Sequence, residues 1–147
     1  MAVTVKKIEL WRREVENRPG VLAGVLGGLA GAGANLEIAM AYRYPGNPSM
    51  GAIEVFPVSG KKMVAAAQAA GLAPLAIAAL RVDGDDRPGT GHAAAQALAD
   101  AGLNISFLVA QVIGRKYTTI IGFDSEADAA AGAKIIRGAA AKGRRRK

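Results

Sequence analysis

Apolar and polar residues alternate along two stretches of the chain in a way that predicts β-strands. In Ile8–Val15 and again in Ile77–Asp83, bulky or β-branched residues recur at every second position. Each stretch is followed by the triplet Arg-Pro-Gly and then by a run rich in alanine, leucine and glycine. Proline is favoured at the first position of a helix, so the pattern predicts helices over residues 21–32 and 90–101.

The same alternation continues after each predicted helix and indicates a pair of strands joined by a turn. Glycine follows both helices, at Gly33 and Gly102, where a left-handed cap favours it. A final helix closes each half, and Ser125 with Asp128 resembles a capping box. The predicted strands are Leu36–Tyr44, Met50–Val58, Ile105–Ile113 and Tyr117–Phe123, and the predicted helices are Lys61–Ala70 and Glu126–Arg137.

The two halves are copies of one unit, related by an offset of 69 residues. Arg18-Pro19-Gly20 recurs as Arg87-Pro88-Gly89, and Asn35 recurs as Asn104. Eight of the eighteen positions from 18 to 35 are identical to their counterparts. The shared triplet and asparagine, in one register, indicate an internal repeat.

A unit of strand, helix, strand, strand and helix predicts an α+β protein made of two ferredoxin-like repeats, βαββα(β), with antiparallel sheets and the helices on one face. We expect repeat 1 over residues 1–72, repeat 2 over residues 73–137 and a disordered basic tail over residues 138–147. Leu75–Asp83 is the strand candidate that begins repeat 2, and it could also close repeat 1. No closing strand follows repeat 2, and the edge left there favours a homodimer.

The net positive charge comes from one end of the chain. The net charge is +7, but residues 1–133 hold 12 basic and 12 acidic side chains. Residues 134–147 hold the other seven basic side chains and no acidic one. Because a nucleic-acid-binding domain spreads its basic residues over a folded face, we do not expect nucleic acid as a partner. The tail is interpreted as solubilising, with non-specific attraction to nucleic acid as the alternative.

Composition excludes several classes of site. The chain has no cysteine and one histidine, which rules out disulfides, thiol nucleophiles and sites that need two imidazoles. The uncharged run Val21–Leu36 is shorter than the roughly 20 apolar residues that cross a membrane. We therefore expect a cytoplasmic protein with no membrane association.

The loop Asn17–Gly20 has the residues of a small ligand site. A helix N-terminus presents unpaired amides and a positive dipole end, which suit a carboxylate or phosphate. Gly20 has no side chain to keep a ligand away from the backbone. The side-chain oxygens of Asn17 and Asn35 could accept hydrogen bonds from an ammonium group. The second copy has Asp86 in place of Asn17, so the two sites should differ. The alternative is that both loops are only turns and helix caps, which favour the same residues.

The motifs of the two loops resemble those of a known domain family. Asn17-Arg-Pro-Gly-Val-Leu22 followed by Ala32-Gly-Ala-Asn-Leu36 resembles the ACT domain, a small amino-acid-sensing module, and Asp86-Arg-Pro-Gly89 with Ala101-Gly-Leu-Asn-Ile105 resembles a second one. The first loop is similar to the serine-binding ACT domain of phosphoglycerate dehydrogenase, but Val15 stands where that relative has histidine.

The resemblance implies a non-catalytic regulatory or sensor protein that binds a small amino acid at these loops and at interfaces between two such domains, with no cofactor. The alternative is a subunit or scaffold that acts on a partner enzyme, as small subunits of acetolactate synthase do, or a transcriptional regulator, without binding free amino acid. The implied ligand-binding residues are Asn17, Arg18, Pro19, Gly20, Val21, Asn35, Asp86, Arg87, Gly89 and Asn104.

Other chemistry is less well supported. His92 lacks the nucleophile motif that catalysis would need, and a surface histidine is the simpler interpretation. Asp83-Gly-Asp-Asp86 lacks the ligand spacing of a calcium loop and is interpreted as a solvated acidic loop. RNA recognition modules share this fold, but they stack bases on aromatic residues of the central strands, and Ile77–Asp83 has none.

Overall fold

The computed structural model describes residues 3–145, which form two compact units, each with a four-stranded antiparallel sheet. One unit is continuous, over residues 9–76, and we call it the inner unit. The other combines residues 1–8 with residues 77–147, and we call it the outer unit. The α+β class and the two βαββα repeats expected from the sequence are confirmed.

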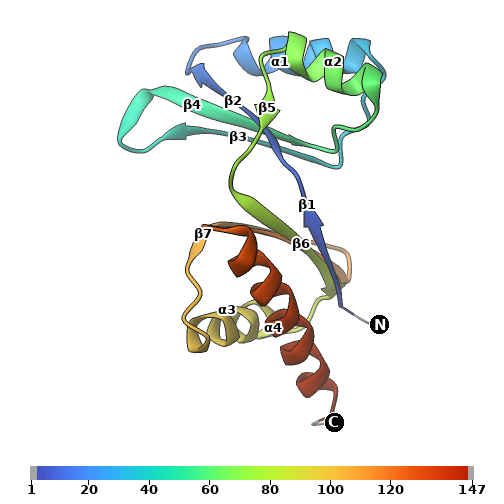
Figure 1. Ribbon diagram of the computed structural model, residues 1–147, viewed down its shortest axis with the longest axis vertical. Coiled ribbons are helices and arrows are strands. Elements are labelled where there is room, and N and C mark those ends of the chain that lie inside the picture. The colour runs from blue at the N-terminus through green and yellow to red at the C-terminus, as the bar shows by residue number, and fades with distance from the viewer. Residues whose placement is uncertain (1–2, 146–147) are drawn as a thin grey trace. The chain divides into compact units, whose positions relative to one another are not determined.

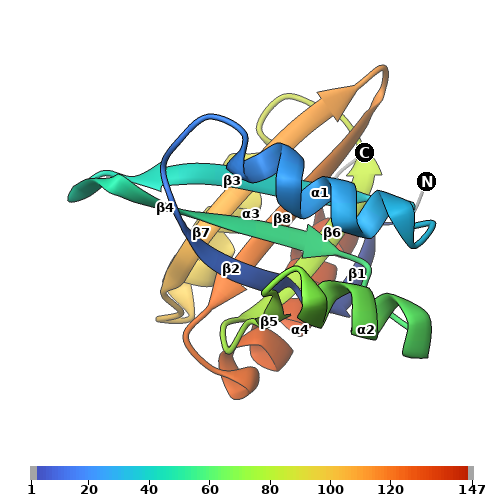
Figure 2. The same cartoon turned by 90° about the horizontal axis from the view of Figure 1, so that it is seen from above.

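The inner unit places two helices on one face of its sheet, whose strand order is β3-β4-β2-β5 (Figures 1 and 2). The face under the helices is apolar because Trp11, Ile53 and Val55 point to that side and pack with Val25 and Leu29 of α1. Its elements are β2 (Trp11–Glu16), α1 (Val21–Gly31), β3 (Ile38–Tyr44), β4 (Asn47–Phe56), α2 (Lys61–Ala69) and β5 (Ala73–Pro74).

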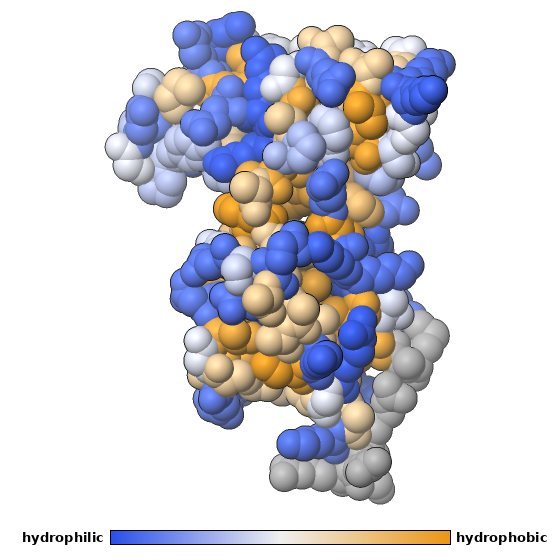
Figure 3. All heavy atoms as spheres, in the orientation of Figure 1, coloured by the Kyte–Doolittle hydropathy of each residue, from blue (hydrophilic) through white to orange (hydrophobic). Residues whose placement is uncertain are grey.

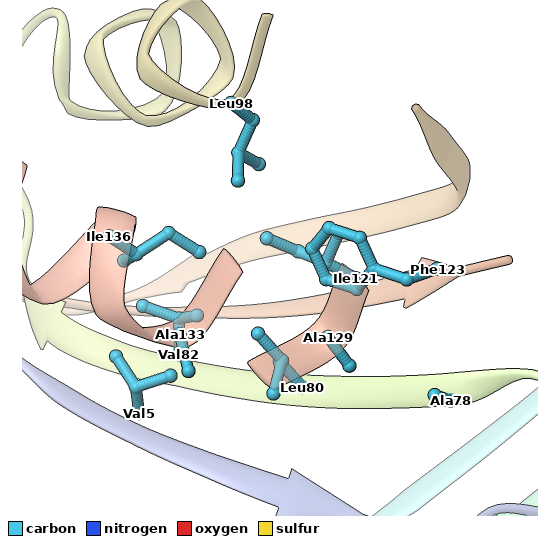
Figure 4. Close-up of a cluster of buried hydrophobic side chains, with 10 residues drawn as sticks. All are labelled: Val5, Ala78, Leu80, Val82, Leu98, Ile121, Phe123, Ala129, Ala133 and Ile136. Carbon is cyan, nitrogen blue, oxygen red and sulfur yellow. The ribbon is translucent and has the colours of Figure 1, made fainter. Parts of the chain in front are cut away.

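The outer unit repeats this arrangement, with sheet order β1-β6-β8-β7 and both helices on one face (Figure 1). Its core surrounds Phe123, which is fully buried, together with Leu80, Leu98 and Ile121 (Figure 4). Its elements are β1 (Thr4–Ile8), β6 (Ala78–Asp85), α3 (Thr90–Asp100), β7 (Ile105–Ile113), β8 (Lys116–Phe123) and α4 (Glu126–Arg145).

The first predicted strand, Ile8–Val15, is wrong as a single element. The chain forms two strands there, and β1 pairs with β6 of the outer unit while β2 pairs with β4 of the inner unit. Val5 and Ile8 of β1 are buried, and Arg137 of α4 donates a hydrogen bond from Nη2 to the carbonyl of Val5 at 2.8 Å. The strand that repeat 2 lacks at its end is therefore supplied from the beginning of the chain.

This exchange corrects two further expectations. The expected boundary between residues 72 and 73 differs from the observed division, which assigns residues 1–8 to the outer unit and extends the inner unit to Ala76. The edge expected to remain open beside β6 is covered by β1, so it gives no argument for a dimer. In the inner sheet, β5 pairs with β2 and forms one edge. Beside it, the Leu75 N–H donates a hydrogen bond to the Leu10 carbonyl at 2.7 Å.

The C-terminal segment is also more ordered than expected. Helix α4 continues to Arg145, beyond the predicted end at Arg137, so residues 138–145 are helical rather than a disordered tail. Residues 146–147 lie outside the described part of the chain. At the other end of α4, Asp128 N–H donates to Ser125 Oγ at 3.1 Å, which confirms the serine half of the predicted capping box.

Among the described residues, no helix is both long enough and apolar enough to cross a membrane.

Candidate functional site

The loop between β2 and α1 is tied to the neighbouring hairpin by Asn17. Its backbone N–H donates to the Ser49 carbonyl at 2.8 Å, and its side-chain Nδ2 donates to the Pro48 carbonyl at 2.9 Å. One of the two N–H donors of the side-chain amide is thus used within the fold. The side-chain oxygen of Asn17, Oδ1, is suited to accept a hydrogen bond from a ligand.

Helix α1 begins after Gly20, which has a positive φ of 89° and is exposed. Left-handed backbone of this kind favours glycine because a side chain there is strained. Pro19 lies in the turn before Gly20, so the expectation that proline occupies the first helical position is wrong for this copy. Arg18 forms an exposed ion pair with Glu16, at 3.6 Å, and Val21 opens the helix.

The loop between β6 and α3 repeats this geometry. Asp86 N–H donates to the Arg115 carbonyl at 2.8 Å, and Gly89 has a φ of 84° before the helix begins at Thr90. Thr90 donates to the Arg87 carbonyl from its N–H at 3.2 Å and from its Oγ1 at 2.9 Å. Pro88 precedes the helix by two residues, as Pro19 does. The Asp86 side chain is exposed at the mouth of this loop.

Neither unit brings its two predicted polar residues together. In the inner unit, Asn17 bonds to Ser49 at the start of β4, whereas Asn35 precedes Glu37, whose N–H donates to the Phe56 carbonyl at the end of β4. Seven residues of extended strand span about 23 Å. Asn17 and Asn35 therefore lie at opposite ends of the sheet, and the hypothesis that they share a ligand within one unit is not supported.

The outer unit has the same separation. Asp86 bonds to Arg115, next to the start of β8, whereas Asn104 precedes Ile105, which pairs with Phe123 at the end of β8. The reason is topological: β7 runs parallel to β6, so it begins at the end of the sheet that is opposite to the β6–α3 loop. Asn104 is exposed there.

A cavity of about 780 Å³ opens at the β6–α3 loop and extends between α3 and the sheet of the outer unit. This volume lies within the range of about 300–1,000 Å³ that is typical of small-molecule sites. Its lining is mostly apolar, and its charged residues, Asp86 and Arg87, belong to the loop. The lining residues are Val82, Asp86, Arg87, Pro88, Gly89, Thr90, Gly91, His92, Ala94, Ala95, Leu98, Leu108, Ala110, Gln111, Val112, Tyr117, Thr119, Ile121 and Ile136.

The floor and one wall of the cavity are set by the core. Leu98 points from α3 toward Ile136 and Ile121, which come from α4 and β8 (Figure 4). Apolar surface is also visible on the side of the outer unit that carries α3 and α4 (Figure 3). Sequence reasoning identified the loop at the mouth, with Asp86, Arg87 and Gly89, but it missed the cavity behind it.

Tyr117 forms the wall opposite Gly84. The two residues pair across β8 and β6, and a Cβ at Gly84 would lie 2.8 Å from the Tyr117 ring, so only glycine leaves room for the ring there. Burial raises the pKa of the Tyr117 hydroxyl, and the negative charges of Asp83 and Asp85 add to the effect. Tyr117 is therefore a neutral hydroxyl at the cavity wall at physiological pH.

The acidic cluster beside this loop is paired with cations and hydroxyls. Asp83 accepts hydrogen bonds from Arg81 Nε at 2.9 Å and from Thr118 Oγ1 at 2.6 Å. Asp85 accepts a hydrogen bond from Lys116 Nζ, and this bond is the first cause that lowers the pKa of Asp85 to about 2. Asp83 and Asp85 are therefore partly buried residues at the end of β6, and the expectation that they form a solvated loop is wrong.

A second polar cluster lies on the face of the inner sheet that points away from the helices. Glu54 is 2% exposed, and it pairs across the strands with Arg12 on one side and Met40 on the other. Burial raises the pKa of the Glu54 carboxyl, while the Arg12 charge and a hydrogen bond from Tyr42 oppose that rise. Arg12 also donates from Nη2 to the hydroxyl of Tyr44 at 2.5 Å.

The raised pKa of Glu54 predicts how stability depends on pH. Below the ordinary value of 4.5, the carboxyl is protonated in both the folded and the unfolded protein. As the pH rises above that value the folded protein retains the proton longer, so the unfolding free energy falls until the buried group has ionised. We expect Glu54→Gln to gain stability relative to wild type between about pH 4 and pH 7 in chemical denaturation.

Glu14→Gln is the matched control, because Glu14 is an exposed carboxyl on β2. It removes the same charge without a buried group. A stability difference between Glu54→Gln and wild type that stays constant over this pH range would contradict the assignment of the desolvation cost to Glu54.

Comparison with solved structures finds several chains with a similar fold. Protein BT0572 of Bacteroides thetaiotaomicron is similar with a TM-score of 0.74, 16% identity and 88% of each chain covered. The regulatory subunit of aspartate kinase from Thermus thermophilus gives a TM-score of 0.63 and 19% identity, over 95% of this chain and 97% of that chain.

The aspartate kinase of Clostridium acetobutylicum, described as an allosteric enzyme, gives a TM-score of 0.61 and 17% identity, over 96% of this chain and 34% of that chain. No protein-family model and no curated protein matches the sequence. At these identities the likeness shows the fold alone, and it agrees with the two βαββα repeats expected from the sequence.

Proposed function

We propose that this chain is a non-catalytic regulatory protein whose ACT-type units bind a small amino acid at the β2–α1 and β6–α3 loops. The observation that carries the proposal is the cavity of the outer unit, which opens where the loop meets the N-terminus of α3. A zwitterion needs a negative group for its ammonium and donors for its carboxylate, and both kinds of group meet at this opening.

The donors are the first amides of α3. Its ladder of helical hydrogen bonds begins with Ala93 N–H on the Gly89 carbonyl, at 2.9 Å. The N–H groups of Gly91 and His92 come before that bond and face the open end of the helix, where the dipole favours an anion. Asp86 supplies the negative charge for the ammonium. In the inner unit, the side-chain oxygen of Asn17 would accept the hydrogen bonds of the ammonium instead.

The separation of Asp86 from Asn104 indicates that a second copy completes the site. Strand β7 is the edge of its sheet, and it exposes Val109 by 47% and Ile113 by 72%. Such an edge is a template for pairing with another chain. If two copies pair antiparallel about Val109, the Asn104 end of one β7 lies beside the Ile113 end of the other, and hence beside its Asp86.

The same reasoning applies to the inner unit, where β3 is the edge strand and Asn35 lies at the far end from Asn17. The proposed assembly is therefore a homodimer that binds its ligand between copies, in the cytoplasm. The fold of the aspartate kinase regulatory subunit supports a partner enzyme as the target. A transcriptional target remains the alternative if binding of DNA survives at high salt without residues 138–147.

Complementation between two inactive variants tests the shared site. Both variants are made in the Asn17→Ala background, which lacks the proposed inner-unit site. Asp86→Ala and Asn104→Ala each remove one side of the outer-unit site, so neither variant alone should show a thermal shift with any of the twenty amino acids at several-millimolar concentration. Mixed, unfolded and refolded together, they should regain binding at a fraction of the sites, because one site per mixed dimer keeps both residues. A ligand at 100 times its Kd adds about 2.7 kcal/mol to wild-type stability, which is several degrees in Tm.

Two results would overturn the proposal. If wild type shows no shift with any amino acid, the chain is not a free amino-acid sensor, and the scaffold alternative takes its place. If Asn104→Ala binds as tightly as wild type while Asp86→Ala does not, the site lies within one chain and the second copy contributes nothing to it. Sedimentation of wild type gives the oligomeric state independently.

A further inference from the structure

The cavity of the outer unit exists because α3 carries smaller side chains than its counterpart α1. The offset of 69 residues aligns Gly91, Ala94 and Ala95 with Leu22, Val25 and Leu26. Ala94 and Ala95 together have five side-chain carbons fewer than Val25 and Leu26, which pack in the inner core, whereas Leu22 is exposed.

Burial within each unit agrees with this difference. In the inner unit, α1 buries Val25 and Leu29, and Leu26 packs against the same core. In the outer unit, α3 buries Leu98 as its sole core residue. The space that Val25 and Leu26 fill in one unit is therefore part of the cavity in the other.

The opposite wall of the cavity presents apolar side chains that α3 does not cover. Leu108 and Val112 of β7 pair with Ile121 and Tyr117, on the sheet face that carries the helices. Despite that position, Leu108 is 48% exposed and Val112 is 53% exposed. This wall is therefore accessible to a ligand in the cavity.

The charged residues of the lining, Asp86 and Arg87, both lie at one end of the cavity. The mouth has Asp86 and the free N–H groups at the start of α3, while the interior is formed by Leu98, Ile121 and Ile136. A ligand that satisfies both parts has charged groups at one end and an apolar body at the other. The zwitterionic head of an α-amino acid, followed by a large apolar side chain, has this form.

We propose that the outer unit binds an α-amino acid with a large aliphatic or aromatic side chain, which enters the cavity beneath α3. The inference rests on the proposed function and specifies its ligand for one unit. The inner unit lacks this specificity, because Val25 and Leu26 occupy the corresponding volume. Burial of each additional methylene favours binding roughly fourfold, so leucine should bind on the order of 60-fold more tightly than alanine.

The test fills the cavity with the residues that α1 already uses. The double variant Ala94→Val/Ala95→Leu should weaken leucine and phenylalanine binding at least tenfold, measured by calorimetry on the full chain, because the side chain is excluded. Its Tm without ligand should equal or exceed that of wild type, which shows that the variant folds. Ala93→Leu is the matched control, since Ala93 is exposed on α3 and does not line the cavity.

Three probes separate the contribution of the ammonium group to binding from that of the apolar side chain. Leucine, serine and 4-methylpentanoate, which is leucine without its ammonium group, are titrated against each variant. Leucine binding that is lost in the filled variant, retained in Ala93→Leu and much weaker for the other two probes supports the proposal. Equal binding of 4-methylpentanoate and leucine would overturn the placement of the ammonium at Asp86.

The remaining outcomes distinguish this inference from the proposed function. If serine binds as tightly as leucine and the filled variant binds both normally, the cavity is not the site and the inference fails, while the amino-acid sensor stands. If no amino acid binds to wild type, both fail. If leucine does not bind and the filled variant changes the oligomeric state, the cavity receives side chains of a second copy and the inference is overturned.

Discussion

Val5→Asp is expected to unfold the outer unit while the inner unit keeps its structure. Val5 is 6% exposed, and it lies in the core with Leu80, Val82 and Ile136. An aspartate there either ionises in an apolar environment without a partner or takes up a proton at a cost. We expect a loss on the order of 4 kcal/mol, which is a large part of the stability of a small unit.

Hydrogen exchange gives the measurement, because it reports each strand separately. Amides of β8 should lose protection in Val5→Asp, while amides of β4 should keep it. Trp11 is the single tryptophan of the chain and belongs to the core of the inner unit, so its fluorescence follows that unit alone. Lys6→Asp is the control, since Lys6 is the exposed neighbour of Val5 on β1.

The opposite pattern would contradict the strand exchange. If protection is lost in β4 and retained in β8, β1 belongs to the first repeat, as the sequence repeat suggested. If Lys6→Asp has the same effect as Val5→Asp, the loss comes from the added negative charge and not from the core.

The strands, helices and turns of this chain are largely visible in the sequence, but the partner of β1 is not. Alternation concerns residues close in sequence, and the repeat predicts two similar sheets. The choice between those sheets depends on which core a strand completes. One local signal was present: Leu10 and Trp11 are adjacent, large and both buried, which breaks the alternation at the point where β1 ends and β2 begins. A single strand cannot bury two successive side chains on one face.

The sequence likewise predicts only part of the candidate site. The Arg-Pro-Gly repeat located both loops, because glycine with positive φ before a helix leaves a sequence signal. The distance between Asn17 and Asn35 left no signal in the sequence, because it follows from the parallel course of β2 and β3. The cavity could have been found by comparing the copies position by position: Gly91, Ala94 and Ala95 stand where α1 has larger residues.

Two glycines of α4 should respond in opposite directions to the same substitution. Gly138 has no atom within 4 Å of the position that a Cβ would take, so Gly138→Ala is expected to stabilise the protein by up to about 1 kcal/mol through helix propensity. A Cβ at Gly132 would lie 2.7 Å from Cζ of Phe123, a ring that is fully buried. Gly132→Ala is expected to destabilise by about 1–3 kcal/mol, because the core must move.

The pair isolates packing from propensity, since both residues lie in one helix and gain the same Cβ. Chemical denaturation should therefore give unfolding free energies for the two variants that differ by about 1–4 kcal/mol. Two variants of equal stability would mean that the Phe123 ring yields to the methyl group, so that the outer core is loosely packed around it. In that case the cavity beneath α3 would belong to a deformable core, and filling it through Ala94 and Ala95 would shift the ring before it excluded a ligand.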